Sequence, residues 1–288
     1  MSVKNFIGYP RSTKEFHDIK EAISKYVLPG FIPENKIFGA GDYVMTQGSC
    51  FARNIADALG SYNVRVIHFN VKEYINTTYA NKVFFQYATG YENPMRQRDL
   101  EALKNMFPQI GVQRKNLIDG IELSKVLILT VGVAPCWFEK STGNVVLDID
   151  KKNLNNYEFK TTGVDWNVKN LLEIIKRVRE INPKLHIILT VSPVPLNKSF
   201  DMESTVVADC VSKSVLRVTV HTLLKLGIAN LNYWPSFEIV RWIGSHIDPV
   251  YGNDDDRPRH VSRDLVAIIV DLFINGFGDD TLELRDKR

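Results

Sequence analysis

Ser49 is the residue whose neighbours best equip it for chemistry. It lies in the segment TQGSCFA, residues 46–52, where a run with strand character gives way to a stretch with helical spacing. Gly48 allows a tight turn at this junction. The start of a helix offers free backbone amides and the positive end of the helix dipole, and both stabilise the oxyanion that forms when an ester is attacked. Ser49 is therefore a candidate nucleophile, although a serine here also serves as an ordinary N-cap.

His260 is the candidate general base for such a nucleophile. It follows three consecutive carboxylates, at residues 254–256, and precedes the last helical stretch. A carboxylate beside a histidine orients the ring and stabilises the imidazolium that forms when the ring takes the serine proton. The same acidic run is also typical of a solvated loop. No run of carboxylates precedes the other histidines, which are His17, His68, His186, His221 and His246.

Other chemistries are disfavoured by the residue types and their spacing. Cys50 follows Ser49, but the first helical residue after a strand usually turns its side chain toward the sheet, so a thiol nucleophile is not expected. The sequence has no His-x-x-x-His or Cys-x-x-Cys spacing and no Gly-rich phosphate loop after a strand. We expect no metal and no nucleotide cofactor.

The elements that must position these residues alternate short apolar runs with longer stretches of helical spacing. This alternation is typical of a parallel sheet covered by helices, so we predict an α/β fold with a mostly parallel sheet. Ser262 is the predicted N-cap of the last helix. Strands are predicted over residues 43–46, 64–67, 126–131, 186–191 and 229–233, and apolar helical stripes over residues 51–59, 168–178, 208–218 and 265–272.

Three further segments complete the predicted organisation. Residues 1–42 are expected to be an irregular N-terminal segment packed on the main domain, which spans residues 43–277. A helical insertion rich in Tyr, Phe, Asn and Gln occupies residues 72–119, either as a cap that shapes the substrate site or as a structural helical pair. The charged residues 278–288 are expected to be a frayed tail.

Composition excludes several classes of protein. The chain has 288 residues with 44% apolar residues, enough for a substantial core, and its 36 basic and 33 acidic residues leave a net charge of +3. No basic block occurs, so we expect no nucleic-acid partner that is bound by phosphate neutralisation. No apolar run is long enough for a signal sequence or a membrane span. Three widely spaced cysteines indicate a reduced, cytoplasmic protein without a disulfide framework.

The sequence around Ser49 resembles that of a known family. Residues 48–52, GSCFA, match letter for letter the motif for which the GSCFA domain family is named, and that family resembles the SGNH hydrolases. Four more blocks follow in the expected order, within a resemblance that covers roughly residues 43–273. They are TVG at residues 130–132, LTVSPVP at 189–195, WPSFEI at 234–239 and the acidic segment that ends at His260. The resemblance implies a three-layer α/β/α domain in which Ser49 is the nucleophile and His260 the base.

The first departure from the wider SGNH pattern concerns the acid of the triad. The usual aspartate stands three residues before the histidine, but that position is Arg257 here. Asp256, four residues before His260, is the nearest carboxylate and the predicted triad acid, ahead of Asp255 and Asp254. A Ser–His dyad without a carboxylate is the alternative.

The second departure concerns the oxyanion site. The block that usually reads Gly-x-Asn-Asp is GVAP here, residues 132–135, so the asparagine that would donate to the oxyanion is missing. We predict that Asn76 replaces it, together with the backbone amides of Ser49 and Gly132. Asn76 is also typical of a helix cap or a turn.

Two more side chains have predicted roles around the site. Trp137, with Phe138, follows the third predicted strand, where it either stacks on a sugar ring or packs under the insertion. Glu238, in the WPSFEI block, is expected to form a buried structural ion pair or to support a residue of the site from behind, and not to act as an acid catalyst.

The resemblance implies an ester hydrolase that removes an acyl group, such as acetyl, from a saccharide or another small ester through an acyl-enzyme on Ser49. Two alternatives remain open. Transfer of the acyl group to a sugar hydroxyl shares the same first half-reaction. A catalytically silent carbohydrate-binding protein would keep the fold without the oxyanion donor.

Overall fold

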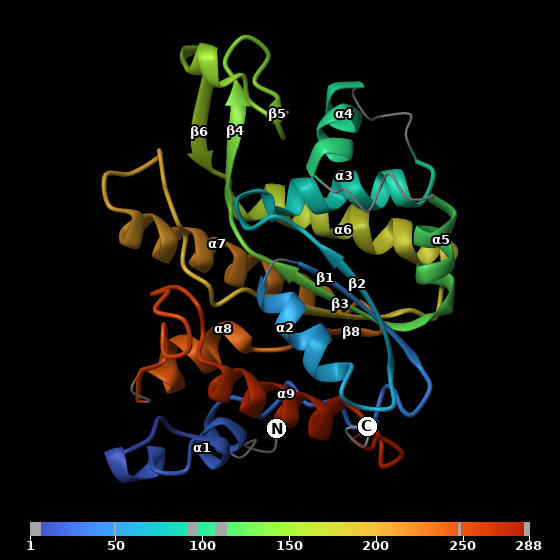
Figure 1. Ribbon diagram of the computed structural model, residues 1–288, viewed down its shortest axis with the longest axis vertical. Coiled ribbons are helices and arrows are strands. Elements are labelled where there is room, and N and C mark those ends of the chain that lie inside the picture. Colours follow the sequence, from blue (N-terminus) through green and yellow to red (C-terminus); the bar gives the residue numbers. More distant parts are fainter. Residues whose placement is uncertain (1–6, 49, 92–96, 107–113, 247–248, 285–288) are drawn as a thin grey trace.

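A five-stranded parallel sheet forms the centre of the molecule (Figure 1). The computed structural model describes residues 7–48, 50–91, 97–106, 114–246 and 249–284. The strand order is β2-β1-β3-β7-β8, and every pairing in this sheet is parallel. The predicted α/β class with a mostly parallel sheet is therefore confirmed. The strands are β1 (Tyr43–Gly48), β2 (Arg65–Asn70), β3 (Ser124–Val131), β7 (His186–Val191) and β8 (Leu231–Tyr233).

Helices cover both faces of this sheet, because successive side chains of a strand point to opposite sides. In β3, Val126 and Ile128 belong to one apolar cluster, while Leu127 and Leu129 belong to another. The first cluster includes residues from α1 (Ile19–Tyr26), α2 (Cys50–Leu59) and α9 (Arg263–Phe277). The second includes residues from α3 (Thr78–Ala88), α4 (Gln97–Met106), α5 (Arg114–Leu123), α6 (Val164–Ile181) and α7 (Thr205–Lys225). The fold thus has the three layers that the resemblance implies.

The described residues of the segment 72–119 are mostly helical, as predicted. It contains the short 3-10 helix η2 (Glu73–Ile75), α3, α4 and the start of α5. Phe84 and Phe85 of α3 are buried in the same cluster as Leu127 of the central strand. This part of the insertion therefore builds the helical layer on one face of the sheet.

A second, antiparallel sheet was not expected from the sequence. Its three strands, in the order β5-β4-β6, project from the main body in Figure 1. Arg98 of α4 bonds to Glu139 at 2.9 Å and to the Tyr157 hydroxyl at 3.0 Å, which fastens α4 to this sheet. The strands are β4 (Pro135–Glu139), β5 (Val145–Val146) and β6 (Tyr157–Thr161).

Both end segments are more ordered than predicted. The segment over residues 1–42 is not irregular throughout, because it contains α1, whose Ile23 is buried against the α9 side of the core. Residues 278–284 of the C-terminal tail are also not frayed. The Asp279 amide donates to the Phe38 carbonyl at 2.9 Å, and the Asn63 amide donates to the Glu283 carbonyl at 3.1 Å. Backbone pairing therefore ties these residues to the main domain.

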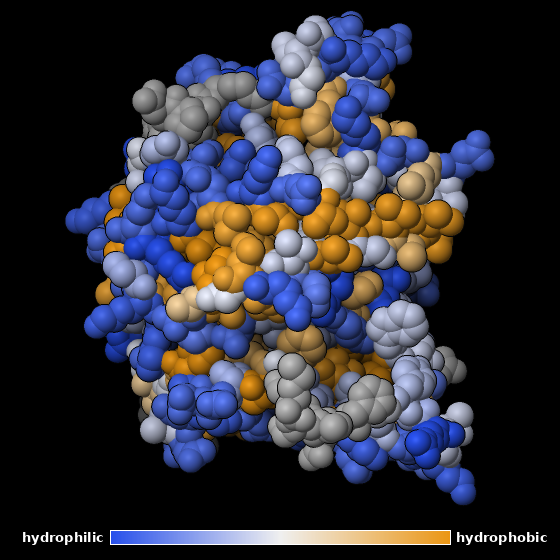
Figure 2. All heavy atoms as spheres, turned by 180° about the vertical axis from the view of Figure 1, so that it is seen from behind, coloured by the Kyte–Doolittle hydropathy of each residue, from blue (hydrophilic) through white to orange (hydrophobic). Residues whose placement is uncertain are grey.

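The outer face of α7 is unusually apolar. Val206 is 82% exposed, and Val207 and Val218 are also exposed, although the opposite face of α7 packs on the sheet. Figure 2 shows a broad apolar band on the side of the molecule that Figure 1 hides. None of the helices in the described ranges is long and apolar enough to cross a membrane.

Candidate active site

Two of the predicted site residues, Ser49 and Gly132, follow the carboxyl ends of neighbouring strands. Ser49 comes directly after β1, and Gly132 comes directly after β3. Ser49 itself lies outside the described residues. Gly48, which precedes it, is required by close packing, since a Cβ at this position would lie 2.7 Å from the Thr130 Cβ and 2.8 Å from the Ala52 Cβ. A side chain at position 48 would therefore collide with β3 and α2.

His260 lies in the loop before α9 with its imidazole bonded to a carboxylate. Its Nδ1 is 2.6 Å from Oδ2 of Asp255, and the side chains are 35% and 33% exposed. Partial desolvation raises the pKa of the Asp255 carboxyl, but hydrogen bonds from His260 and from the Arg257 amide outweigh it, so the pKa lies below its ordinary value. A charged carboxylate at Nδ1 leaves Nε2 as the nitrogen that can accept a proton.

Asp255, and not the predicted Asp256, is the carboxylate that faces the ring. The Asp256 amide donates to the Gly252 carbonyl at 3.1 Å, and Asp256 adopts a left-handed φ of 55°, so the chain turns sharply here. Asp256 is consequently exposed, while the preceding side chain points at His260. Asp254 has a third role, because its carboxylate accepts from the Arg263 amide at 2.7 Å, at the start of α9.

The residue next to His260 links this loop to the segment that carries Asn76. The Arg259 guanidinium forms an ion pair with Glu73 of η2. It also donates to the Pro195 carbonyl at 3.1 Å. Glu73 and Asn76 flank the same turn of 3-10 helix, since the Asn76 amide donates to the Glu73 carbonyl at 3.1 Å. The predicted base and the predicted oxyanion donor thus come from two segments that are directly bonded to each other.

Asn76 and Gly132 lie against each other. The Gly132 amide donates to the Asn76 backbone carbonyl at 2.9 Å, so the predicted Gly132 donor is already engaged. The Asn76 side chain is fully buried, and its Nδ2 has no hydrogen-bond partner among the described residues. A Cβ on Gly132 would lie only 2.9 Å from this nitrogen. Of these two predicted donors, only the Asn76 side-chain amide therefore has no hydrogen-bond partner among the described residues.

A groove of about 480 Å³ lies beside His260 and is bounded by α2, α9 and the loop between residues 254 and 261. Its apolar lining includes Phe51, Val194 and Val261, and its polar lining includes Asn54, Asp57 and Arg263. Cys50, the neighbour of Ser49, lines the same groove. The structure thus brings the start of α2 and the His260–Asp255 pair to one open surface.

Cys50 is exposed, so the expectation that its side chain turns toward the sheet is wrong. The reason is that Phe51 and Ala52 take the inward positions at the start of α2. Cys136 is the opposite case, because burial raises the pKa of its thiol to about 12. In the described ranges, no group of three or more His, Cys, Asp or Glu side chains is placed to hold a metal ion.

Trp137 is not part of this groove. It lies on β4, with ring centroids 4.9 Å from Phe159 and 5.3 Å from Phe200. Phe200 is 66% exposed, so the three rings form an aromatic surface beside the second sheet. Glu238 forms an ion pair with Arg217, as predicted, and also accepts from the Tyr233 hydroxyl at 2.7 Å.

A buried cation lies behind Gly132, and the sequence reasoning missed it. Lys213 of α7 is 1% exposed, and its Nζ donates to the Gly132 carbonyl at 2.6 Å. Burial lowers the pKa of this amine to about 8, although the nearby Asp209 carboxylate opposes the shift. The available signal was a lysine on the helix face that also carries Ala208, Leu216 and other buried residues.

Asn81 and Gln47 were also missed. Gln47 is a polar residue near the end of the buried strand β1, and Asn81 lies in the first turn of α3, most of whose side chains are buried. Both side chains are fully buried, and the Gln47 amide donates to Asn81 at 2.7 Å. A polar side chain inside an apolar pattern is the signal that could have singled them out.

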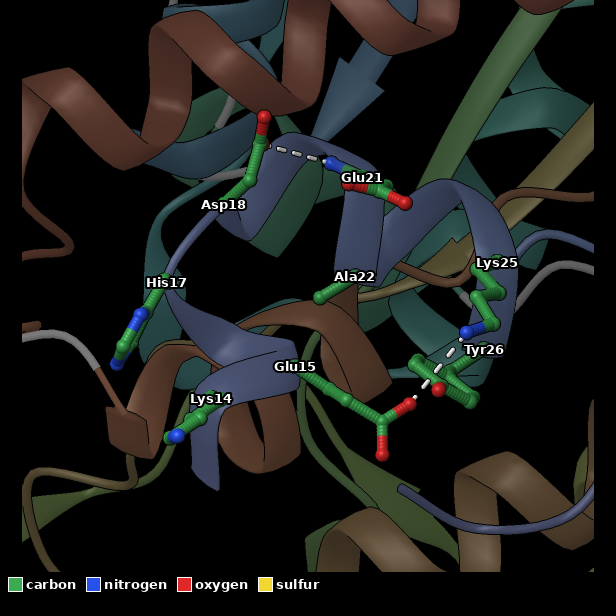
Figure 3. A pocket seen from close by; sticks show the side chains of 8 residues that line it. All are labelled: Lys14, Glu15, His17, Asp18, Glu21, Ala22, Lys25 and Tyr26. Carbon is green, nitrogen blue, oxygen red and sulfur yellow. Dashed lines mark hydrogen bonds and ion pairs between the residues drawn. The ribbon is translucent and has the colours of Figure 1, made fainter. Parts of the chain in front are cut away.

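A second hollow, on the N-terminal segment, shares no lining residue with the groove beside His260 (Figure 3). Asp18 accepts from the Glu21 amide at 2.9 Å as the cap of α1, and Glu15 pairs with Lys25 at 3.4 Å. These side chains stabilise local helices, so the hollow is not the candidate site.

Two solved structures are similar to this chain at low sequence identity. A solved structure of a protein described as a GDSL-like lipase from Parabacteroides merdae is 12% identical, with a TM-score of 0.46, and the match covers 84% of this chain and 99% of that chain. A carbohydrate esterase family 2 enzyme with a carbohydrate-binding domain, from Corynascus thermopiles (Myceliophthora fergusii), is 11% identical, with a TM-score of 0.40, over 85% of this chain and 68% of that chain. No curated protein matches the sequence. Residues 43–273 match the model of the GSCFA family, and the chain therefore belongs to this family.

Proposed function

We propose that this chain is a serine-dependent ester hydrolase of the SGNH type that works through an acyl-enzyme on Ser49. The observation that carries the proposal is the bond of 2.6 Å between His260 Nδ1 and Asp255, in a groove that Cys50 also lines. A histidine held by a carboxylate next to a serine at a helix start is the arrangement that activates a hydroxyl for attack.

In the first half-reaction the Ser49 hydroxyl oxygen attacks the ester carbonyl carbon, and its proton passes to Nε2 of His260. The Asp255 carboxylate accepts the Nδ1 hydrogen bond and stabilises the imidazolium. The tetrahedral intermediate then expels the alcohol, which takes the proton from His260. This leaves the acyl group on Ser49.

The negative charge of the tetrahedral intermediate needs a donor, and the Asn76 side-chain amide is proposed for this role. Its Nδ2 is buried without a partner among the described residues, and a buried donor without a partner costs free energy in the resting protein. An oxyanion that accepts from this amide would recover that free energy in the transition state, where it accelerates the reaction. A free Asn76 donor favours an enzyme over a catalytically silent binding protein.

In the second half-reaction a water molecule attacks the acyl carbonyl carbon and gives a proton to Nε2 of His260. The second tetrahedral intermediate then expels the Ser49 oxygen, which takes this proton back, and the carboxylic acid leaves. An acylated saccharide is the proposed substrate, because the polar side chains along the groove, such as Asn54 and Asp57, can bond to sugar hydroxyls. Transfer to a sugar would use the same groups, with a hydroxyl of the acceptor in the place of water.

The test is turnover of a chromogenic acetyl ester by the wild type and by Ser49→Ala. We expect Ser49→Ala to lower turnover by ~10³-fold or more without loss of the fold. A serine-directed fluorophosphonate should add one label, on the peptide that contains Ser49, and Cys50→Ala should keep the activity. Labelling of Cys50 instead would refute the serine mechanism. Analysis of the products with a sugar acceptor present then separates hydrolysis from transfer.

A further inference from the structure

A chain of three buried side-chain amides leads from strand β1 to the proposed oxyanion donor. Gln47 Nε2 donates to Asn81 Oδ1 at 2.7 Å, and Asn81 Nδ2 donates to Asn76 Oδ1 at 2.9 Å. All three residues are fully buried. They come from β1, from α3 and from the turn before α3. Three segments of the fold therefore meet in one hydrogen-bonded line.

A backbone carbonyl determines the direction of this chain. The Asn81 Nδ2 also donates to the Thr77 carbonyl at 2.7 Å. A carbonyl oxygen can only accept, so the NH2 group of Asn81 must lie on this side and its Oδ1 on the side of Gln47. The second hydrogen of the same NH2 group then requires an acceptor at Asn76. The Asn76 amide is thereby held with its oxygen toward Asn81 and its NH2 group toward Gly132.

The two ends of the chain are unsatisfied, which a purely structural network would avoid. Gln47 Oε1 and Asn76 Nδ2 have no partner among the described residues, and both are buried. A buried polar group without a partner destabilises the folded protein, so apolar side chains at these positions would be more stable. The chain is thus better explained by the orientation that it imposes on Asn76 than by its contribution to stability.

We propose that Asn81, supported by Gln47, is a positioning residue that presents the NH2 group of Asn76 to the oxyanion of the bound ester. This inference rests on the proposed function. An amide that was free to turn over would offer its oxygen about as readily as its nitrogen, and an oxygen in that place repels the developing negative charge. Asn81 acts on the reaction only through Asn76.

The main test is Asn81→Leu, which keeps a similar side-chain shape and removes both donors. We expect kcat on an activated acetyl ester to fall by about 10-fold or more while KM stays within about twofold, because the lost interaction exists only in the transition state. Gln47→Met should lower kcat by only about threefold, because the Thr77 carbonyl still holds Asn81. If Asn81→Leu does not fold, Asn81→Asp carries the same test, because its carboxylate draws the Asn76 NH2 group away from the oxyanion.

Asn167→Leu is the matched control. Asn167 of α6 is also fully buried, donates to the Thr162 hydroxyl and to the Gly163 carbonyl at 2.8 Å each, and accepts from the Thr78 hydroxyl at 2.6 Å. Asn167→Leu removes as many side-chain hydrogen bonds as Asn81→Leu, but none of them is with Asn76. We expect its kcat to stay within about twofold of the wild type. A fall as large as that of Asn81→Leu would overturn the inference.

The double variant Asn76→Ala with Asn81→Leu decides whether Asn81 acts through Asn76. We expect it to be no slower than Asn76→Ala alone, because the positioned group is already absent. Additive losses would overturn the inference, as would a wild-type kcat in folded Asn81 variants. Failure of this inference leaves the labelling of Ser49 and the inactivity of Ser49→Ala unchanged, whereas failure of the proposed function removes both.

Discussion

The two sides of the candidate site are built in opposite ways. On one side Gln47, Asn81 and Asn76 are fully buried, and hydrogen bonds to one another and to the backbone fix each amide. On the other side His260 and Asp255 are about one third exposed and lie on a turn. A buried polar side chain can neither reorient nor form a hydrogen bond with water, whereas an exposed side chain can do both. The buried side should therefore be sensitive to small changes of shape, and the exposed side only to loss of the chemical group.

The Arg259–Glu73 ion pair joins the two sides. Both side chains are partly exposed, so this contact contributes little to stability and mainly keeps the loop of His260 beside the segment of Asn76. His260 is thus held near the buried segment of Asn76 although its own loop is open to solvent.

The largest effect is expected on the exposed side, from His260→Ala. This variant removes the base, so turnover of an activated ester should fall by ~10³-fold or more, while the thermal unfolding midpoint stays close to that of the wild type. The double variant Ser49→Ala with His260→Ala should turn over the ester no more slowly than either single variant, because both residues serve one catalytic unit. Full additivity of the two losses would show that they do not act together.

The next effect should distinguish the three neighbouring carboxylates. Asp255→Asn should lower turnover by about 100-fold, since an amide favours the wrong imidazole tautomer and cannot stabilise the cation. Asp256→Asn is the matched control and should leave turnover within about twofold, because this side chain is exposed and makes no contact with the ring in the described structure. Equal turnover in both variants would mean that a Ser49–His260 dyad works without a carboxylate.

The main sheet and its helices could be predicted because apolar periodicity encodes them locally. The continuous apolar run of β3 and the stripe of α6 are examples, and both elements lie where the pattern predicts them. The second sheet was missed because β5 has only two residues and its pairing depends on a partner strand, β4. Short antiparallel strands carry too little pattern to be recognised alone.

The sequence singled out candidate residues for the site but not the contacts between them. His260 and Asn76 could be picked out from their neighbours in the sequence. The choice of Asp255 over Asp256 depends on a left-handed residue inside a turn, and the contact of Gln47 with Asn81 joins positions 34 residues apart. Neither depends on periodicity, so neither could be read from the chain alone.

A smaller effect is expected from one added methyl group on the buried side. In Gly132→Ala the new Cβ would lie 2.9 Å from Asn76 Nδ2 and 3.2 Å from Asn76 Cβ, and Asn81 prevents the Asn76 amide from moving aside. We expect turnover to fall by about 10-fold and stability by roughly 1–3 kcal/mol. Gly163→Ala, where nothing lies within 4 Å of the added Cβ, is the control for activity. Wild-type turnover in Gly132→Ala would show that the buried side is not rigid.

The last prediction concerns the pH dependence of stability, which should come from Lys213 on the buried side. Burial lowers the pKa of this amine from its ordinary 10.5 to about 8. Below about pH 8 the amine is charged in both states, so the cost of burying the charge is fully present. Between about pH 8 and 10.5 the unfolded chain binds a proton that the folded protein has lost, so the free energy of unfolding rises with pH.

Lys213→Met should lack this rise in the free energy of unfolding, which we expect to be on the order of 1–3 kcal/mol. Urea unfolding at about pH 7 and about pH 10 measures it as the difference between wild type and variant, so that titration of other groups cancels. Lys225→Met, at the exposed end of the same helix, should change with pH as the wild type does. If the free energy of unfolding changes with pH in the same way for the wild type and Lys213→Met, the Lys213 amine behind Gly132 is solvated. The contrast between a buried side and an exposed side of the site would then not hold at Lys213, where it is expected to be strongest.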